Sequence, residues 1–167
     1  MSLDNIRLSK ETCENLFAKD LIELDNSSID KGVQKVTTTI SSLGENQQQI
    51  LFIVNEPEQR FLPDDEMDLL SNLITACKLS MADIVLVNFY HNRFQYHDFA
   101  NQFHPVKILL FGVSTEELNL PFTIPFFQIQ PFQEQLYLTA PSLKNFLNNK
   151  DLKKELWASL QKLFLKK

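Results

Sequence analysis

Three short apolar runs stand out along the chain, at residues 50–54, 84–87 and 106–111, and Lys107 is the one polar residue in them. Each run has the length of a strand, and the lack of apolar–polar alternation is typical of a strand buried on both faces. Segments with helical spacing of apolar residues lie between the runs. This order predicts an α/β domain with a mainly parallel central sheet that helices cover on both sides.

The clearest helical segment follows the first run. Asp64 or Asp65 can cap a helix that ends near Lys78. Apolar residues at helical spacing place one face of this helix on the sheet. They are Met67, Leu70, Leu73, Ile74 and Cys77.

Two further helices are expected around the third strand. Residues 94–103 can form a short helix with Phe99 and Phe103 on one side. Ser114 and Glu117 have the three-residue separation of a capping box, which predicts another short helix beginning there.

The C-terminal part of the chain continues the same alternation. Residues 124–129 and 135–138 are candidate strands on either side of Pro131, and a helix from residues 141–142 to Leu147 follows. A final helix is expected from Asp151 to about Leu165. Its apolar face would be formed by Leu152, Leu156, Trp157, Leu160, Leu163 and Phe164.

Residues 1–46 differ in character from the rest. They are predicted to form an N-terminal segment, followed by a single α/β domain over residues 47–167. Ser9 can cap a short helix through Phe17. Residues 32–43 are rich in Thr, Val and Ser, which leaves both a strand and a weak helix open for them.

Composition narrows the classes of function. The chain has 167 residues, the usual size of one domain, and a net charge of -5. This charge disfavours a protein whose main task is to hold nucleic-acid phosphates, so direct nucleic-acid binding is expected to be weak or absent. With three glycines in all, the chain lacks a phosphate-binding loop and a dinucleotide fingerprint.

Cysteine usage and hydropathy bear on location. No apolar run approaches the roughly 20 residues of a membrane span, and the first residues lack the apolar core of a signal peptide. Cys13 and Cys77 are isolated, as in proteins of a reducing compartment. We therefore expect a cytoplasmic protein with no membrane association, in which Cys77 is buried and unreactive.

The sequence offers no strong catalytic constellation. His91, His97 and His104 are six and seven residues apart, whereas helical metal ligands are three or four apart, so no metal site or cofactor is predicted. Glu56 follows the first strand, where it can be either a general base or a solvated loop carboxylate. Because no Ser/His/Asp order or nucleophile elbow is present, we predict no catalytic residues and expect a binding protein instead of an enzyme.

Aromatic residues are plentiful in two segments of weak periodicity, residues 89–96 and 122–132. Most Phe side chains are expected in the core. Aromatic residues exposed in these two segments would be candidate anchors for a protein partner.

The order of residues from 50 to 164 resembles that of a known family. Residues 50–88 follow a strand–loop–helix–strand pattern, and residues 136–164 (LYLTAPSLKNFLNNKDLKKELWASLQKLF) lead through one helix to a closing Leu-Trp helix. Both stretches are similar to the psi subunits of the bacterial DNA polymerase III holoenzyme. This resemblance implies the fold of the uracil-DNA glycosylases, a three-layer α/β/α sandwich with a mainly parallel central sheet.

The motifs of the glycosylases are altered in this chain. Those enzymes place a G-E-x-P-G loop after the first strand and a T-x-H-P-S motif near the last helices. Here residues 55–58 read NEPE, and residues 139–142 read TAPS, with Ala140 at or beside the place of the His. Alanine cannot donate a hydrogen bond or stabilise developing negative charge. The resemblance therefore implies a fold kept and an activity lost, with a vestigial pocket formed by Asn55, Glu56, Asn88, Phe89 and Ser142.

The same resemblance implies an accessory role in DNA replication. Psi subunits bridge the clamp-loader ATPase to the chi subunit, which contacts single-strand-binding protein. Their N-terminal segment docks on the clamp loader, and residues 1–25 are the analogous region here. The apolar residues that either contact this partner or pack on their own domain are Leu8, Leu16, Phe17, Leu21 and Ile22.

Two other hypotheses stay open: an active uracil-DNA glycosylase-like DNA repair or nucleotide-binding enzyme, and an α/β protein of unrelated role. The enzyme requires a polar pocket near Asn55, Glu56, Asn88 and Ser142, in which Phe89 could stack on a flipped base. A deep pocket of this kind would favour the enzyme. A filled pocket, with an exposed apolar patch elsewhere, would favour the adaptor.

Overall fold

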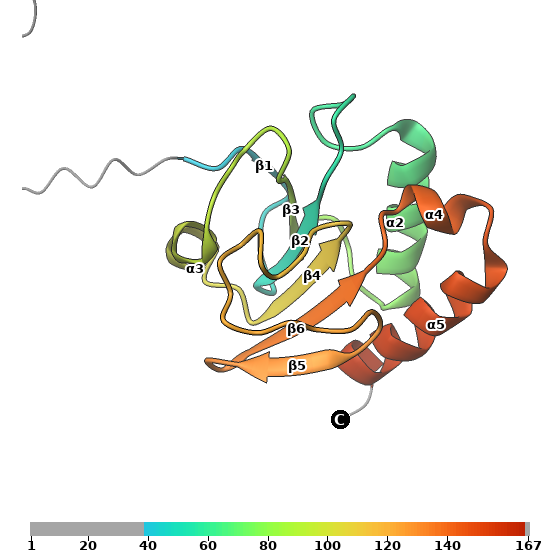
Figure 1. Ribbon diagram of the computed structural model, residues 1–167. Coiled ribbons are helices and arrows are strands. Elements are labelled where there is room, and N and C mark those ends of the chain that lie inside the picture. Colours follow the sequence, from blue (N-terminus) through green and yellow to red (C-terminus); the bar gives the residue numbers. More distant parts are fainter. Residues whose placement is uncertain (1–38, 166–167) are drawn as a thin grey trace, which may run out of the picture. The chain divides into compact units, whose positions relative to one another are not determined.

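The computed structural model describes residues 39–165 (Figure 1). In this part of the chain, six strands form one sheet in the order β1-β3-β2-β4-β6-β5. The strands are β1 (Ser42–Leu43), β2 (Ile50–Val54), β3 (Ile84–Asn88), β4 (Lys107–Phe111), β5 (Ile129–Phe132) and β6 (Gln135–Ala140). The helices are α2 (Asp64–Ala76), α3 (Tyr96–Phe103), α4 (Lys144–Leu147) and α5 (Lys150–Leu160), and a π-helical turn, η1 (Gln161–Leu165), extends α5.

The sheet is mixed, with parallel strands in its interior. β2 pairs in parallel with β3 on one side and β4 on the other, and β4 pairs in parallel with β6. The edge strands β1 and β5 run antiparallel to their neighbours. The predicted α/β class and the three apolar strands are confirmed, since every residue of β2 and β3 is buried.

Alternate residues of the central strands belong to two separate cores. Phe52, Phe111 and Leu138 pack against α2, α4 and α5 on one face of the sheet. Leu51 and Tyr137 pack on the other face against α3 and the segment that follows β4. Figure 1 shows α2, α4 and α5 together on one side of the sheet and α3 on the other.

Helix α2 confirms the predicted apolar face but not the predicted cap. Leu70, Ile74 and Cys77 are buried, and Met67 and Leu73 are partly buried against the same core. The N-cap position is occupied by Pro63, which makes no side-chain hydrogen bond, so Asp64 and Asp65 are not caps. They lie in the first turn, where a negative charge is favoured by the helix dipole.

The segment around α3 and β4 corrects one prediction. Helix α3 forms with Phe99 and Phe103 buried, as expected. The capping-box hydrogen bonds at Ser114 and Glu117 also form, at 2.8 and 3.2 Å. No helix follows them, because Asn119 adopts a left-handed conformation (φ 56°) and the Leu120 N–H donates to Thr115 O, which closes a turn.

The strands near Pro131 differ from those expected. Residues 124–128 are not a strand, since Phe127 has a positive φ of 64° and cannot continue an extended chain. Instead β5 begins at Ile129 and includes Pro131. A proline is tolerated there because β5 is an edge strand.

Of the two C-terminal helices, α4 begins slightly later than expected and α5 begins one residue earlier. Helix α4 starts at Lys144, two residues beyond Ser142. Helix α5 starts at Lys150 because the Asn149 side chain caps it, accepting hydrogen bonds from the N–H groups of Asp151 and Leu152. On its predicted apolar face, Leu156, Leu160 and Leu163 are buried.

The sheet includes residues on the N-terminal side of the expected boundary at residue 47. β1 pairs with β3, and Ile40 is buried. The Gln102 side chain exchanges two hydrogen bonds with the backbone of Ile40, at 2.9 and 3.1 Å. Among residues 39–165, no helix combines the length and apolar character needed to cross a membrane.

Candidate functional site

The carboxyl ends of the parallel strands bring together most of the expected site residues. Asn55 and Glu56 follow β2, Asn88 ends β3, and Ser142 follows β6. Because these strands are parallel, their carboxyl ends meet at one edge of the sheet, where ligands bind in many α/β folds.

The Asn88 side chain lies at the centre of this edge and is fully buried. Its oxygen accepts hydrogen bonds from the N–H groups of Glu56 and Tyr90, both at 3.1 Å. Its amide donates to the carbonyl oxygens of Glu56, Gln59 and Arg60 at 2.7, 3.0 and 3.3 Å. All of the hydrogen-bonding capacity of this amide is therefore directed at the protein's own backbone.

Asn55, Gly112 and Ser142 form a second group at the same edge. The Asn55 amide donates to Gly112 O at 3.4 Å, and the Gly112 N–H donates to Ala140 O at 3.0 Å. Ser142 lies so close to Gly112 that a Cβ on the glycine would be 3.1 Å from the Ser142 Cβ. These contacts bring Asn55 and Ser142 to the same glycine.

Phe89 is not available for stacking on a base. Its side chain is buried, with its ring edge-to-face against Phe94 at 5.2 Å. The Arg93 guanidinium lies over the Phe89 ring at 4.8 Å. The stacking role that the enzyme hypothesis gives Phe89 is therefore not supported, because its side chain is buried in the core on the α3 side.

A buried carboxylate, Glu66, was missed by the sequence analysis. It lies in the first turn of α2 and is 3% exposed, beside Glu56, which is 9% exposed. Burial raises the pKa of Glu66, the charge of Glu56 raises it further, and Lys144 partly opposes these effects. The spacing Glu66, Leu70, Ile74 places it on the buried face of the helix, which is the signal that could have found it.

This carboxylate makes stability depend on pH. A raised pKa means that the folded protein holds the Glu66 proton more tightly than the unfolded chain. The resulting stabilisation is present below the ordinary Glu pKa of about 4.3 and is lost as pH rises through the folded-state pKa. We expect Glu66→Gln to increase the free energy of unfolding at pH 7 and to flatten its decline above pH 4, measured by urea denaturation. Asp68→Asn, on the exposed face of α2, is the matched control; a decline that persists in Glu66→Gln would contradict the assignment.

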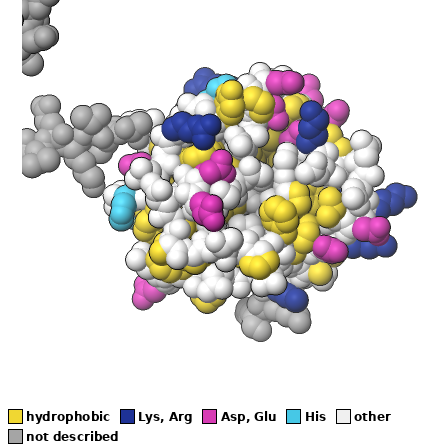
Figure 2. Space-filling model, in the orientation of Figure 1, with side chains coloured by type: hydrophobic (Ala, Val, Ile, Leu, Met, Phe, Trp, Pro, Cys, Tyr) yellow, Lys and Arg dark blue, Asp and Glu magenta, His cyan; other side chains and the backbone are white. Residues whose placement is uncertain are grey.

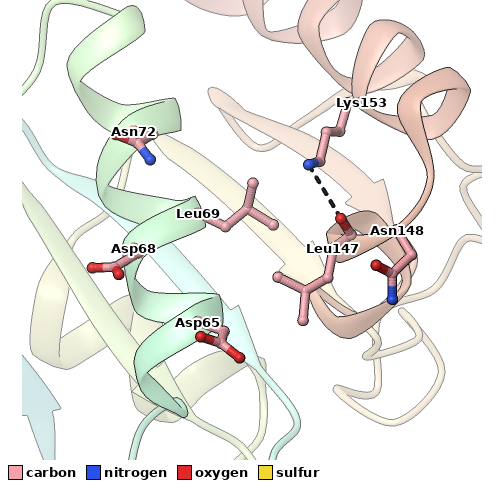
Figure 3. A pocket seen from close by; sticks show the side chains of 7 residues that line it. All are labelled: Asp65, Asp68, Leu69, Asn72, Leu147, Asn148 and Lys153. Carbon is pink, nitrogen blue, oxygen red and sulfur yellow. Dashed lines mark hydrogen bonds between the residues drawn. The ribbon is translucent and has the colours of Figure 1, made fainter.

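A separate hollow of about 420 Å³ lies between α2, α4 and α5 (Figure 3). Leu69 and Leu147 point toward each other across it, and the Lys153 ammonium donates to Leu147 O at 3.4 Å. Asp65, Asp68, Asn72 and Asn148 complete the lining. None of the expected site residues lines this hollow, so it is not the predicted pocket.

The remaining candidate residues are dispersed. The His91 ring nitrogen Nε2 lies 2.9 Å from Gln59 O, and His104 ends α3 in a left-handed conformation. Within residues 39–165, no three His, Cys, Asp or Glu residues are grouped to hold a metal ion. Cys77 is buried, as predicted, and burial raises the pKa of its thiol, which lowers the fraction of the nucleophilic thiolate.

The predicted partner-binding residues lie outside the described part of the chain. They are Leu8, Leu16, Phe17, Leu21 and Ile22. In the two aromatic-rich segments, the exposed aromatic side chains are Tyr90 and Phe126.

No protein-family model and no curated protein matches this chain. The family resemblance and the function that it implies therefore stay predictions.

Proposed function

We propose that this chain is a non-catalytic accessory subunit of the bacterial replicative DNA polymerase, similar to the psi subunits. In this role it connects the clamp-loader ATPase to other replication proteins in the cytoplasm, directly to a chi subunit and through it to single-strand-binding protein. The proposal includes the fold of that family, a three-layer α/β/α sandwich like that of the uracil-DNA glycosylases. Two cores on opposite faces of the sheet support this fold.

The observation that carries the proposal is the use of the Asn88 amide within the protein. A glycosylase-like site needs polar side chains directed at a ligand, whereas Asn88 makes five hydrogen bonds to the backbone of Glu56, Gln59, Arg60 and Tyr90. Glu56 is used in the same way, since its carboxylate accepts a hydrogen bond from the Glu58 N–H at 3.0 Å. Because these side chains hold the protein's own loops in place, they favour a structural role for this edge of the sheet over a catalytic one.

The test is co-purification with the clamp-loader ATPase of the same source. We expect the full-length chain to elute with the ATPase and a variant without residues 1–25 to elute alone. Because residues 39–165 form both cores, the truncated variant should keep its cooperative unfolding transition. Full-length Lys154→Glu, changed on α5, is the surface control and should still bind.

The paired substitution Leu16→Asp and Phe17→Asp refines this test. If these residues contact the ATPase, the paired variant should lose at least about tenfold in affinity, because buried interface anchors dominate binding energy. Retention of the complex by both this variant and the truncated chain would contradict the proposed contact. Absence of any complex with the full-length chain would overturn the adaptor function.

One observation favours the alternative of a uracil-DNA glycosylase-like or nucleotide-binding enzyme. Buried carboxylates with a raised pKa, such as Glu66 beside Glu56, gather at active sites. A uracil-excision assay on single-stranded DNA distinguishes the two functions. If the chain excises uracil and the Glu56→Gln substitution abolishes this activity, the result would support the enzyme. It would also remove the main argument for the adaptor.

A further inference from the structure

Two neighbouring loops at the carboxyl edge are held together by Asn88, the last residue of β3, and by His91, which follows the strand. Asn88 donates to the carbonyl oxygens of Gln59 and Arg60, and the His91 ring nitrogen lies 2.9 Å from Gln59 O. The loop after β2 (residues 55–63) is thereby fastened to the loop after β3 (residues 89–95). Side chains carried by both loops are presented from a backbone with little freedom to rearrange.

These loops carry a surface that we call the basic–aromatic surface, made of Arg60, Tyr90, His91 and Arg93. Tyr90 is 47% exposed, and the His91 ring lies edge-on to the Tyr90 ring at 5.3 Å. The Arg93 guanidinium lies 5.9 Å from the centre of the Tyr90 ring. Figure 2 shows basic, His and hydrophobic side chains next to one another at the upper edge of the molecule.

Neither arginine of this surface is neutralised by a carboxylate within residues 39–165. The one ion pair in this part of the chain joins Lys154 and Asp151 at 3.8 Å. Arg60 instead lies over the Phe61 ring at 5.5 Å and donates to Ser41 Oγ at 2.8 Å. Both guanidinium groups therefore keep donors that can pair with carboxylates of another molecule.

We propose that the basic–aromatic surface binds an acidic segment of a partner protein, with partner carboxylates on Arg60 and Arg93 and an apolar side chain against Tyr90. The proposal rests on the adaptor function and assigns it a second contact, separate from residues 1–25. Tyrosine and arginine are the residue types most enriched at interface hot spots. The fastened loops reduce the ordering cost of binding.

The surrounding charges favour an acidic protein segment over a nucleic acid. Arg93 lines a hollow of about 370 Å³ together with Asp98 and Glu117, whose carboxylates accept hydrogen bonds from the N–H groups of Gln95 and Ser114. The exposed Glu58 lies on the neighbouring loop. Carboxylates at these places repel a continuous row of phosphates, whereas a peptide can place single carboxylates on the two arginines.

The test is an NMR titration of the isotope-labelled full chain with a synthetic twelve-residue peptide of alternating Leu and Glu. We expect shift changes concentrated in residues 56–62 and 89–95. Arg93→Glu and Arg60→Glu should each weaken binding about tenfold, and Tyr90→Ala should weaken it by a similar factor. Lys154→Glu changes the net charge by the same amount on a side chain that is 81% exposed and should have no effect.

Each other outcome overturns the proposal. Equal weakening by Lys154→Glu would show a non-specific charge effect, and shifts outside the two loops would place binding elsewhere. Shifts produced by a twelve-nucleotide thymidine strand but not by the peptide would assign the surface to nucleic acid. Because the titration contains no clamp-loader subunit, its failure leaves the co-purification test of the adaptor function unaffected.

Discussion

Replacing Asn88 with alanine is expected to lower the free energy of unfolding by about 3–4 kcal/mol. The substitution removes five hydrogen bonds from a side chain that is completely buried. The backbone N–H and carbonyl oxygen of Glu56, a residue that is 9% exposed, would lose their partners in a place that water reaches poorly, and each such group costs about 1–3 kcal/mol. Urea denaturation at pH 7 measures the change.

The loss of these hydrogen bonds should also increase local opening of the backbone near Asn88. Amide hydrogen exchange should accelerate at Glu56 and Tyr90, whose N–H groups donate to Asn88 Oδ1, before it changes in α5. Asn72→Ala, an exposed position on α2, is the matched control and should change stability by less than about 0.5 kcal/mol. A stability loss for Asn88→Ala no greater than that of the control would mean that the loops are fastened by other contacts.

Replacing Gly44 with alanine is expected to cost about 3 kcal/mol or more. Gly44 has a φ of 106°, a conformation that residues with a Cβ rarely adopt. A Cβ at this position would lie 2.2 Å from Ile84 O and 2.9 Å from Met81 O. Both contacts are with backbone atoms, so no side-chain rotation can relieve them.

Gly112→Ala provides a graded comparison for this steric argument. Gly112 also has a positive φ, 68°, but its nearest neighbour would be the Ser142 Cβ at 3.1 Å. We expect a smaller cost, about 1–2 kcal/mol, because the left-handed region is accessible to alanine at that penalty. Thermal and urea unfolding should therefore show that Gly44→Ala is less stable than Gly112→Ala.

The structural consequence of Gly44→Ala should begin at β1. This two-residue strand is held by its pairing with β3, and the Asn46 N–H donates to Ile84 O just beyond the glycine. We expect fast amide exchange in Ser42 and Leu43 of the variant. Equal stability of the two glycine variants would show that residues 39–46 can separate from the sheet at little cost.

The sequence by itself determined the inner strands and the faces of the main helices. Residues 50–54 and 84–87 are apolar at every position, and such runs are stable only where both faces of a strand are covered. The period of Leu70, Ile74 and Cys77 likewise selects one face of α2. These features are local, because burial of a short segment depends on its own apolar pattern.

Local hydrogen bonds at a capping box were a poorer guide to whether a helix follows. Ser114 and Glu117 form the predicted reciprocal bonds, yet the chain turns at Asn119 instead of forming a helix. A cap stabilises the first turn, but whether a helix continues depends on the packing that follows. Here Leu118 is buried in the core that contains α3, and the turn at Asn119 follows it.

The character of the candidate site was decided by the tertiary structure. Asn55, Glu56 and Asn88 could be placed at one sheet edge from the ends of the strands, but their roles could not. Asn88 and Glu56 are 32 residues apart, and the hydrogen bonds between them exist only because β2 and β3 are paired in one register. The direction of the Phe89 ring and the burial of Glu66 depend in the same way on neighbours distant in the sequence, since a side chain's partners are set by packing and not by its own segment.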